Sequence, residues 1–172
     1  RGLMAEQDNI WSHHLGLSII RGNSHIIERT PLHIQRTPKD SIFISFDFIS
    51  AAFFYQGKQC LAVQPHDMVI YRTDNPYLFG FKSNMRQIII DLPAETMQHI
   101  HQIALDQPVL LRATTAPQRL LQRTLAQCCR HFMAQPCSER LVVLQEQIIG
   151  LMTALLCADR PSMGQSGLSL VY

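Results

Sequence analysis

The sequence predicts an α+β fold in which an antiparallel β-barrel is followed by a C-terminal helical segment. Up to about Pro93, short runs of β-branched and aromatic residues alternate with turn residues, at roughly the 8–12-residue spacing of all-β sandwiches and barrels. After Pro93 the apolar residues recur at helical spacing instead. The 172 residues, of which 47% are hydrophobic, suffice for one domain with its own core.

The strands are expected from their residue types and from the turns that flank them. The clearest run is Ser41-Ile-Phe-Ile-Ser-Phe-Asp-Phe-Ile49, in which β-branched and aromatic residues dominate. Gln56-Gly57 separates two later runs, and its glycine suits the positive φ of a hairpin turn. The expected strands are 17–21, 24–28, 41–49, 51–55, 58–63, 67–71, 77–81 and 85–91.

Three helices are expected after the strands. The first begins at Pro93 with a glutamate in its first turn, as helix N-termini prefer, and Pro108 ends it at the latest. The second covers residues 116–134 and also has a proline at its start. The third covers residues 139–158.

The third helix has an apolar seam and a second apolar flank. The seam has the spacing of helices that pack together, and it consists of Leu141, Leu144, Ile148, Leu151 and Leu155. A helix that packs on one surface needs a single stripe, yet a second flank is formed by Val142, Val143, Ile149, Met152 and Leu156. The helix can pair with the second helix of its own chain or contact a partner chain, and we expect both. The predicted homodimer interface comprises Leu144, Ile148, Leu151 and Leu155.

The chain is expected to have four parts: a leader over 1–16, a barrel over 17–93, a helical dimerisation segment over 94–158 and a linker over 159–172. The residues after Asp159 are Arg-Pro-Ser-Met-Gly-Gln-Ser-Gly, which is the composition of a linker. They lead into a short apolar run that ends at Tyr172. We interpret this run as the beginning of a further domain.

Charge and cysteine content exclude several functional classes. Fifteen basic residues against thirteen acidic ones leave a net charge of +2, and no basic cluster stands out, so this part of the protein is not expected to bind DNA by itself. No apolar run of about 20 residues is recognised, so no membrane span is expected. Five cysteines without a CxxC motif indicate a reducing compartment, and we expect a cytoplasmic location.

No catalytic or metal-binding constellation is expected. On a helix, the rings of His99 and His101 would project about 160° apart, so they could not share a metal ion. GxSxG, P-loop and HExxH patterns are absent from the sequence. We therefore expect no enzyme activity, no cofactor and no metal. Asp47 is unusual on an apolar strand: either it faces the interior with a partner such as Arg86, or it is a solvated strand residue.

Four segments follow one another in the order and spacing of a known family. They are RTPLHIQRTPKD at 29–40, QGKQCLAVQPHDMVIY at 56–71, DNPY at 74–77 and RQIIIDLP at 86–93. Together they resemble the N-terminal cupin-like domain of AraC/XylS-type transcriptional regulators, over roughly residues 18–158. His66 departs from the pattern, because cupins have glycine between the proline and aspartate that flank it here.

The resemblance implies a cupin-like barrel of the jelly-roll type that senses an effector, and a helical segment that mediates dimerisation. It also implies a C-terminal domain beyond the linker, with two helix-turn-helix motifs that read DNA. Metal-dependent cupin enzymes begin their ligand set with HxH, whereas this chain has Phe46-Asp47-Phe48 at the matching place. The alternatives are a metal-free or atypical cupin enzyme and a dimerisation module without a ligand.

The candidate effector pocket rests on the alternation of side chains along two strands. If Arg86 faces inward, Ile88 does too, and Tyr77 and Phe79 alternate on the neighbouring strand. With Asp47, these residues are the candidate ligand contacts. Aromatic rings with one arginine suit a small amphipathic molecule, such as a carboxylate or an aromatic compound. The alternative is a barrel filled by its own side chains.

Overall fold

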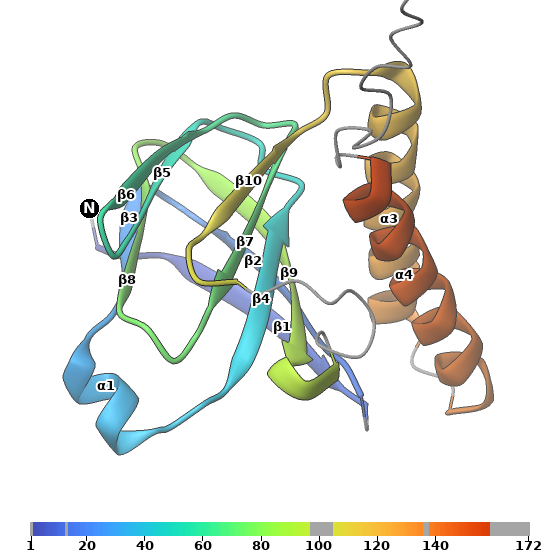
Figure 1. The fold of residues 1–172 in the computed structure, drawn as a ribbon, viewed down its shortest axis with the longest axis horizontal. Helices are drawn as coiled ribbons and strands as arrows, with labels where there is room; N and C mark the ends of the chain where they lie inside the picture. Colours follow the sequence, from blue (N-terminus) through green and yellow to red (C-terminus); the bar gives the residue numbers. More distant parts are fainter. Residues whose placement is uncertain (1, 13, 97–104, 136–137, 159–172) are drawn as a thin grey trace, which may run out of the picture.

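The computed structural model describes residues 2–12, 14–96, 105–135 and 138–158. These residues form two antiparallel sheets and a layer of two long helices, α3 (Ala116–Ala134) and α4 (Ser138–Ala158), which lie side by side (Figure 1). A short helix, α1 (Pro31–Arg36), connects the two sheets.

The large sheet has six strands in the order β1-β2-β9-β4-β7-β10. Their bounds are Ala5–Trp11 (β1), Gly16–Gly22 (β2), Met85–Pro93 (β9), Ser41–Phe46 (β4), Asp67–Arg72 (β7) and Val109–Arg112 (β10). The small sheet has four strands in the order β3-β8-β5-β6. Their bounds are His25–Arg29 (β3), Tyr77–Phe81 (β8), Ala52–Gln56 (β5) and Gln59–Val63 (β6). Every adjacent pair in both sheets is antiparallel.

All of the expected strands are present, with small differences at their ends. The longest expected run stops at Phe46, because Asp47 has a φ of 59° and leaves the extended region. The hairpin turn between β5 and β6 is confirmed, since Gln56 pairs with Gln59 and Gly57 has a φ of 60°.

The two sheets face each other as a sandwich, and the expected barrel is not closed. Among the described residues, no hydrogen-bonded strand pair joins the large sheet to the small one. The expectation of an antiparallel, cupin-like fold followed by helices is nevertheless confirmed. A sandwich and an open barrel differ only in strand pairing at the edges, which the alternation within each strand does not specify.

Two strands lie outside the range predicted for the barrel. β1 lies within the predicted leader and pairs with β2 along its whole length, from Ala5 opposite Gly22 to Trp11 opposite Gly16. Its residues are mostly polar and exposed, so no apolar alternation reveals it. β10 interrupts the predicted helical segment and adds four residues to the edge of β7.

The helices after Thr115 match the prediction closely. α3 begins with a capping box, in which Thr115 and Gln118 each accept a hydrogen bond from the other residue's backbone N–H. α4 begins one residue before the predicted start. The helix predicted from Pro93 is present at 94–96, whereas its remainder and the pair His99 and His101 lie outside the described residues.

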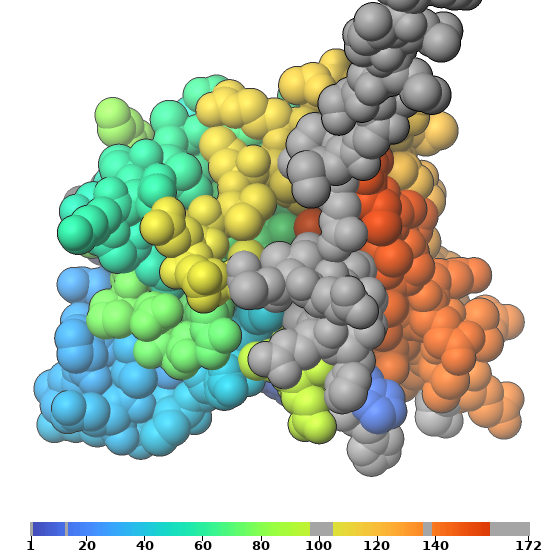
Figure 2. Space-filling model, viewed as in Figure 1, coloured from blue at the N-terminus to red at the C-terminus, as the bar shows by residue number. Residues whose placement is uncertain are grey.

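Both faces of the large sheet are covered, so the molecule has two cores. The inner core lies between the sheets and includes Phe54, Val69, Phe79 and Ile89. The outer core lies between the large sheet and the two long helices and includes Ile44, Ile88, Leu125 and Phe132. Figure 2 shows the consequence for the surface, where the helices (orange to red) form one side of the molecule and the strands (blue to green) the other.

Helix α4 meets the length and composition criteria of a membrane span, which was not recognised in the sequence. Residues Glu139–Ala158 are long and apolar enough to cross a membrane by length and composition alone. In the structure α4 packs beside α3, and Ile148, Met152 and Leu155 are buried in the outer core. A core helix of a globular domain meets the same two criteria, so this property alone is weak support for a span.

Candidate functional site

A cavity of about 310 Å³ lies between the two sheets, and we call it the lumen cavity. Aromatic rings and aliphatic side chains form most of its wall, but its lining also includes an ion pair and several amides and hydroxyls. The residues that line it are Gln7, Asn9, Trp11, Ser18, Ile20, Ile27, Lys39, Phe43, Tyr71, Tyr77, Phe79, Gln87, Ile89 and Asp91.

Alternation along β9 decides which of its residues reach the lumen cavity. Gln87, Ile89 and Asp91 line the cavity. Ile88 and Ile90, on the opposite face of the strand, are buried in the outer core. The expectation that Arg86 and Ile88 share a face is compatible with this alternation, but that face is turned toward the helices.

An ion pair between Lys39 and Asp91 closes one part of the lumen cavity. Asp91 is buried within β9, whereas the side chain of Lys39, just before β4, is 31% exposed. The Lys39 ammonium also lies 4.4 Å from the centroid of the Trp11 ring and 5.3 Å from that of Phe43. The carboxylate and two aromatic faces therefore surround this ammonium, each of them a favourable neighbour for a cation.

Two tyrosines form an aromatic wall of the cavity. The rings of Tyr71 and Tyr77 meet edge to face, with centroids 4.9 Å apart. The Tyr71 hydroxyl shares a hydrogen bond of 3.3 Å with the hydroxyl of Ser45. Burial raises the pKa of Tyr71 well above its ordinary value, and it also raises the pKa of Tyr77. Both phenols are therefore neutral in the physiological range.

Gln87 carries a buried polar atom without a partner among the described residues. The residue is 1% exposed, and its Oε1 accepts no hydrogen bond from them. A buried acceptor without a partner costs free energy, but this oxygen is covered by protein and is not open to the cavity.

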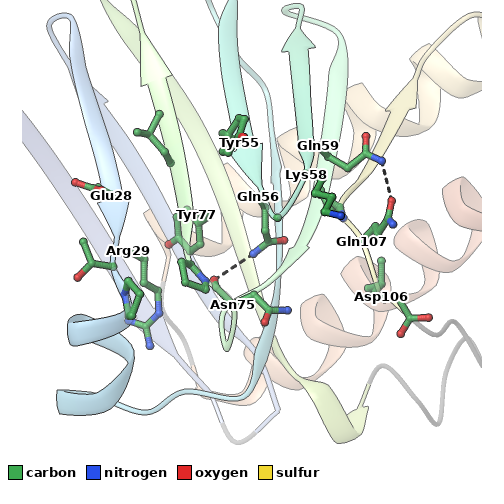
Figure 3. A pocket seen from close by; sticks show the side chains of 17 residues that line it. Glu28, Arg29, Tyr55, Gln56, Lys58, Gln59, Asn75, Tyr77, Asp106 and Gln107 are labelled. Carbon is green, nitrogen blue, oxygen red and sulfur yellow. Dashed lines mark hydrogen bonds between the residues drawn. The ribbon is translucent and has the colours of Figure 1, made fainter.

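A second, larger hollow lies at one end of the sandwich, and we call it the outer groove. Its volume is about 660 Å³, and Tyr77 is the one residue that lines both it and the lumen cavity. Figure 3 shows that several of its polar groups are paired with one another. Gln59 donates to Gln107 at 2.7 Å, and Gln56 donates to the carbonyl oxygen of Asn75 at 3.2 Å.

The structure divides the predicted pocket residues. Tyr77 and Phe79 line the lumen cavity, as predicted. Asp47, Arg86 and Ile88 do not line this cavity, because the face of β9 that carries Arg86 and Ile88 is turned toward the helical layer.

Asp47 instead joins the large sheet to α3. Its carboxylate lies 3.1 Å from Arg86 on β9 and accepts a hydrogen bond of 2.6 Å from Arg130 on α3. Of the two alternatives left open for Asp47, the pairing with Arg86 is present, but on the helix side of the sheet rather than between the sheets. Asp47 holds this position with a left-handed backbone, which aspartate tolerates better than most residues.

The predicted dimer-interface residues pack within their own chain. Ile148 is fully buried and Leu155 is 4% exposed, while Leu144 and Leu151 are partly buried against the same outer core. Ile148 and Leu155 are thus unavailable to a partner, and their assignment to an interface was wrong. The exposed large apolar residues of α4 are Val142 and Val143, whereas Met152 and Leu156 of the same predicted flank are buried.

Sequence reasoning missed Trp11, Lys39, Gln87 and Asp91 as cavity residues. Gln87 and Asp91 flank three consecutive isoleucines and share a face with Ile89, and this is the one signal that could have found them. Polar residues on one face of a buried strand indicate that the face is turned toward something polar. Within the described ranges, no three His, Cys, Asp or Glu side chains come together as metal ligands would.

The profile of one protein family, that of the AraC-binding-like domain, matches residues 23–157, which is most of the chain. The chain belongs to this family. The resemblance noted in the sequence is thereby confirmed, and so is the connection of this AraC-binding-like domain with regulation.

Solved structures share the fold. The domain is similar to the AraC-like transcriptional activator CuxR, with a TM-score of 0.72 and 16% identity, over 96% of this chain and 60% of CuxR. A weaker similarity relates it to the EutQ protein of Clostridium difficile, with a TM-score of 0.42 and 10% identity, over 54% of this chain and 71% of EutQ. These similarities concern the fold, and the second carries no argument about function.

One curated relative is similar over a shorter stretch. It is an uncharacterized protein in the nit 5′ region of Bacillus sp. (strain OxB-1), 25% identical over 77 residues. The match covers 45% of this chain and 30% of the Bacillus protein. The chain thus spans less than two thirds of both the Bacillus protein and CuxR.

Proposed function

We propose that this chain is the effector-sensing and dimerisation domain of an AraC-type transcriptional regulator that acts in the cytoplasm. In this proposal a C-terminal domain outside the chain contacts DNA, and the present domain controls that contact without catalysing a reaction. Membership of the AraC-binding-like family and the fold shared with CuxR support the regulatory role. The low net charge of +2 is consistent with DNA contacts made elsewhere.

The lumen cavity is the single observation that carries the sensing function. It lies between the sheets, it is partly open on the side of Trp11, and it combines aromatic rings with the Lys39–Asp91 ion pair. Cavities that combine apolar walls with a few oriented polar groups are typical of small-molecule sites. The Lys39–Asp91 pair is neutral overall, and the other polar groups are amides and hydroxyls, which hold a ligand rather than transfer protons at neutral pH.

The large sheet provides a physical route from the cavity to the helices. β9 carries Gln87 and Asp91 on its cavity face, and Ile88 in the outer core on the other. The Arg86–Asp47–Arg130 cluster then ties β9 directly to α3. In this proposal, a ligand that contacts β9 binds some arrangements of the sheet and helices more tightly than others. Binding then increases the population of those arrangements.

The surface of α4 supports dimerisation. One side of α4 is buried in the outer core, but Val142 and Val143 near its start are 60% and 55% exposed. Long apolar helices are rarely left uncovered, because their exposure to water is unfavourable. A second copy of the chain that covers this flank of α4 gives a symmetric dimer, the commonest oligomer of soluble proteins.

Native mass spectrometry with two matched variants tests the sensing function. Ile27 lines the lumen cavity, whereas Ile26 next to it on β3 is 59% exposed. The parent protein is expected to carry a small molecule from the cell or to acquire one from a cell extract. Ile27→Trp fills the cavity and is expected to lose that molecule, whereas Ile26→Trp is expected to keep it.

Two outcomes contradict the sensing function. One is a parent protein that never carries or acquires a small molecule. The other is an Ile27→Trp variant that folds normally and retains the molecule, which would place binding elsewhere, for example in the outer groove. Circular dichroism of both variants separates loss of binding from loss of fold.

A further inference from the structure

We propose that the effector of the lumen cavity is a small organic cation, and that the Lys39 ammonium takes the place of its charged group when no such ligand is bound. This inference rests on the proposed sensing function and assigns a chemical class to the ligand. It reverses the sequence-based expectation of a carboxylate, because the arginine on which that expectation depended faces the helices.

The surroundings of the Lys39 ammonium are those of a cation-binding cage. Asp91 supplies a carboxylate, and the rings of Trp11 and Phe43 lie 4.4 Å and 5.3 Å from the ammonium. Aromatic faces carry negative electrostatic potential and attract cations, most strongly where water is excluded. The same three groups suit the ammonium of a ligand as well as they suit that of a lysine.

Lys39 and Asp91 differ in how easily each side chain can move out of the ion pair. Lys39 precedes β4, its side chain is 31% exposed, and its long stem lets the ammonium move into solvent at little cost. Asp91 lies within β9, and its side chain is 7% exposed. A cationic ligand can therefore displace Lys39 and keep Asp91 paired. An anionic ligand that drew Lys39 away would leave a buried carboxylate without a counter-charge, which is strongly unfavourable.

Gln87 lies on the same face of β9 as Asp91 but four residues away, about 13 Å along an extended strand. A small ligand held at Asp91 therefore does not extend to Gln87. The volume of about 310 Å³ restricts the ligand to a small molecule that contacts Asp91, Trp11 and Phe43.

Binding can be followed at Trp11, because it is the only tryptophan of the chain and lines the lumen cavity. Three probes of matched size differ in charge: cyclohexylmethylammonium, cyclohexylmethanol and cyclohexanecarboxylate. All three are transparent where tryptophan is excited. We expect a saturable fluorescence change with the ammonium compound, at least tenfold weaker binding of the alcohol and no binding of the carboxylate. Isothermal titration calorimetry provides an independent measurement.

Three variants test the assigned roles. Asp91→Asn removes the counter-charge and is expected to weaken binding of cyclohexylmethylammonium at least tenfold. Lys39→Met removes the internal competitor and is expected to tighten binding several-fold. Asp106→Asn, in the outer groove, is the matched control and is expected to change nothing.

The outcomes distinguish this inference from the proposed function. If the carboxylate or the alcohol binds at Trp11 and the ammonium compound does not, the cation assignment is overturned, while the sensing function stands. Unchanged ammonium binding in both Asp91→Asn and Lys39→Met also overturns it. If no probe binds even to Lys39→Met, the cation assignment fails. This comparison does not depend on whether Asp91→Asn folds. The sensing function fails with it only if native mass spectrometry also finds no small molecule.

Discussion

Along β9, neighbouring side chains belong to different parts of the molecule. Gln87 and Asp91 line the lumen cavity, and Arg86, directly before Gln87, reaches Asp47 on the helix side. A single strand thus carries both the polar groups of the candidate site and a link to α3. In the proposed function, a ligand in the cavity therefore affects the helices through β9 without touching them.

Tyr71 is the residue for which the structure predicts a pH effect. Its raised pKa means that the folded protein keeps the phenol protonated when the unfolded chain has lost that proton. The contribution to stability is therefore complete below about pH 10, the ordinary tyrosine pKa, and is lost as the pH rises above it. We expect the free energy of unfolding of the parent to fall above about pH 10, and Tyr71→Phe to reduce that fall.

Urea unfolding at neutral pH and above about pH 10 measures this effect. At neutral pH, Tyr71→Phe is expected to cost about 1 kcal/mol, because the Ser45 hydroxyl loses its partner. Tyr55→Phe on the exposed face of β5 is the control and is expected to change stability by less than about 0.5 kcal/mol. A Tyr71→Phe variant that loses as much stability at high pH as the parent contradicts the assignment.

Among the elements, α3 depends on its N-terminal cap. Thr115 accepts a hydrogen bond from the N–H of Gln118, and α3 contributes Leu125 and Phe132 to the outer core. We expect Thr115→Ala to lower the free energy of unfolding by about 1 kcal/mol, since one N-terminal amide loses its partner. Urea unfolding measures the change.

Helix α1 offers a matched comparison for this prediction. Thr30 caps α1 with the same capping-box geometry, but α1 buries no residue. Thr30→Ala is therefore expected to loosen α1 locally and to cost less than Thr115→Ala in global unfolding. Equal costs for the two variants would show that cap strength alone, rather than coupling to the outer core, sets the effect.

At the scale of the whole molecule, the exposed flank of α4 predicts a dimer. We expect the parent to sediment as a dimer and Val143→Glu to weaken the dimer at least tenfold, because a charge would be buried against an apolar partner. Ile26→Glu, at a similarly exposed isoleucine on β3, is expected to remain dimeric. Sedimentation velocity over a range of concentrations measures both.

A parent that is monomeric at all concentrations would contradict the dimer, and so would a Val143→Glu variant that sediments like the parent. Leu151 is not suitable for this test. Its side chain packs against the outer core, so a charge there would damage the fold of the single chain.

Local sequence patterns were sufficient for much of the architecture. The strands from β2 to β9 and the helices α3 and α4 follow from periodicity and turn residues, and Gly57 marks its hairpin directly. β1 and β10 were not predicted, because neither has an alternation of apolar and polar residues long enough to indicate a strand. β1 is polar and exposed at the sheet edge, and β10 has only four residues. Each is a strand because an existing strand, β2 or β7, offers it a free edge.

The sequence by itself determined the class of fold, the family and the two aromatic cavity residues Tyr77 and Phe79. Only the tertiary structure decided which face of the large sheet is the cavity face. Both faces of that sheet are covered, one by the small sheet and the other by α3 and α4, so apolar residues occupy both sides of β9. Alternation then tells which residues share a face but not where that face points. This is why Arg86 was placed in the pocket and Asp91, with the opposite charge, was found there.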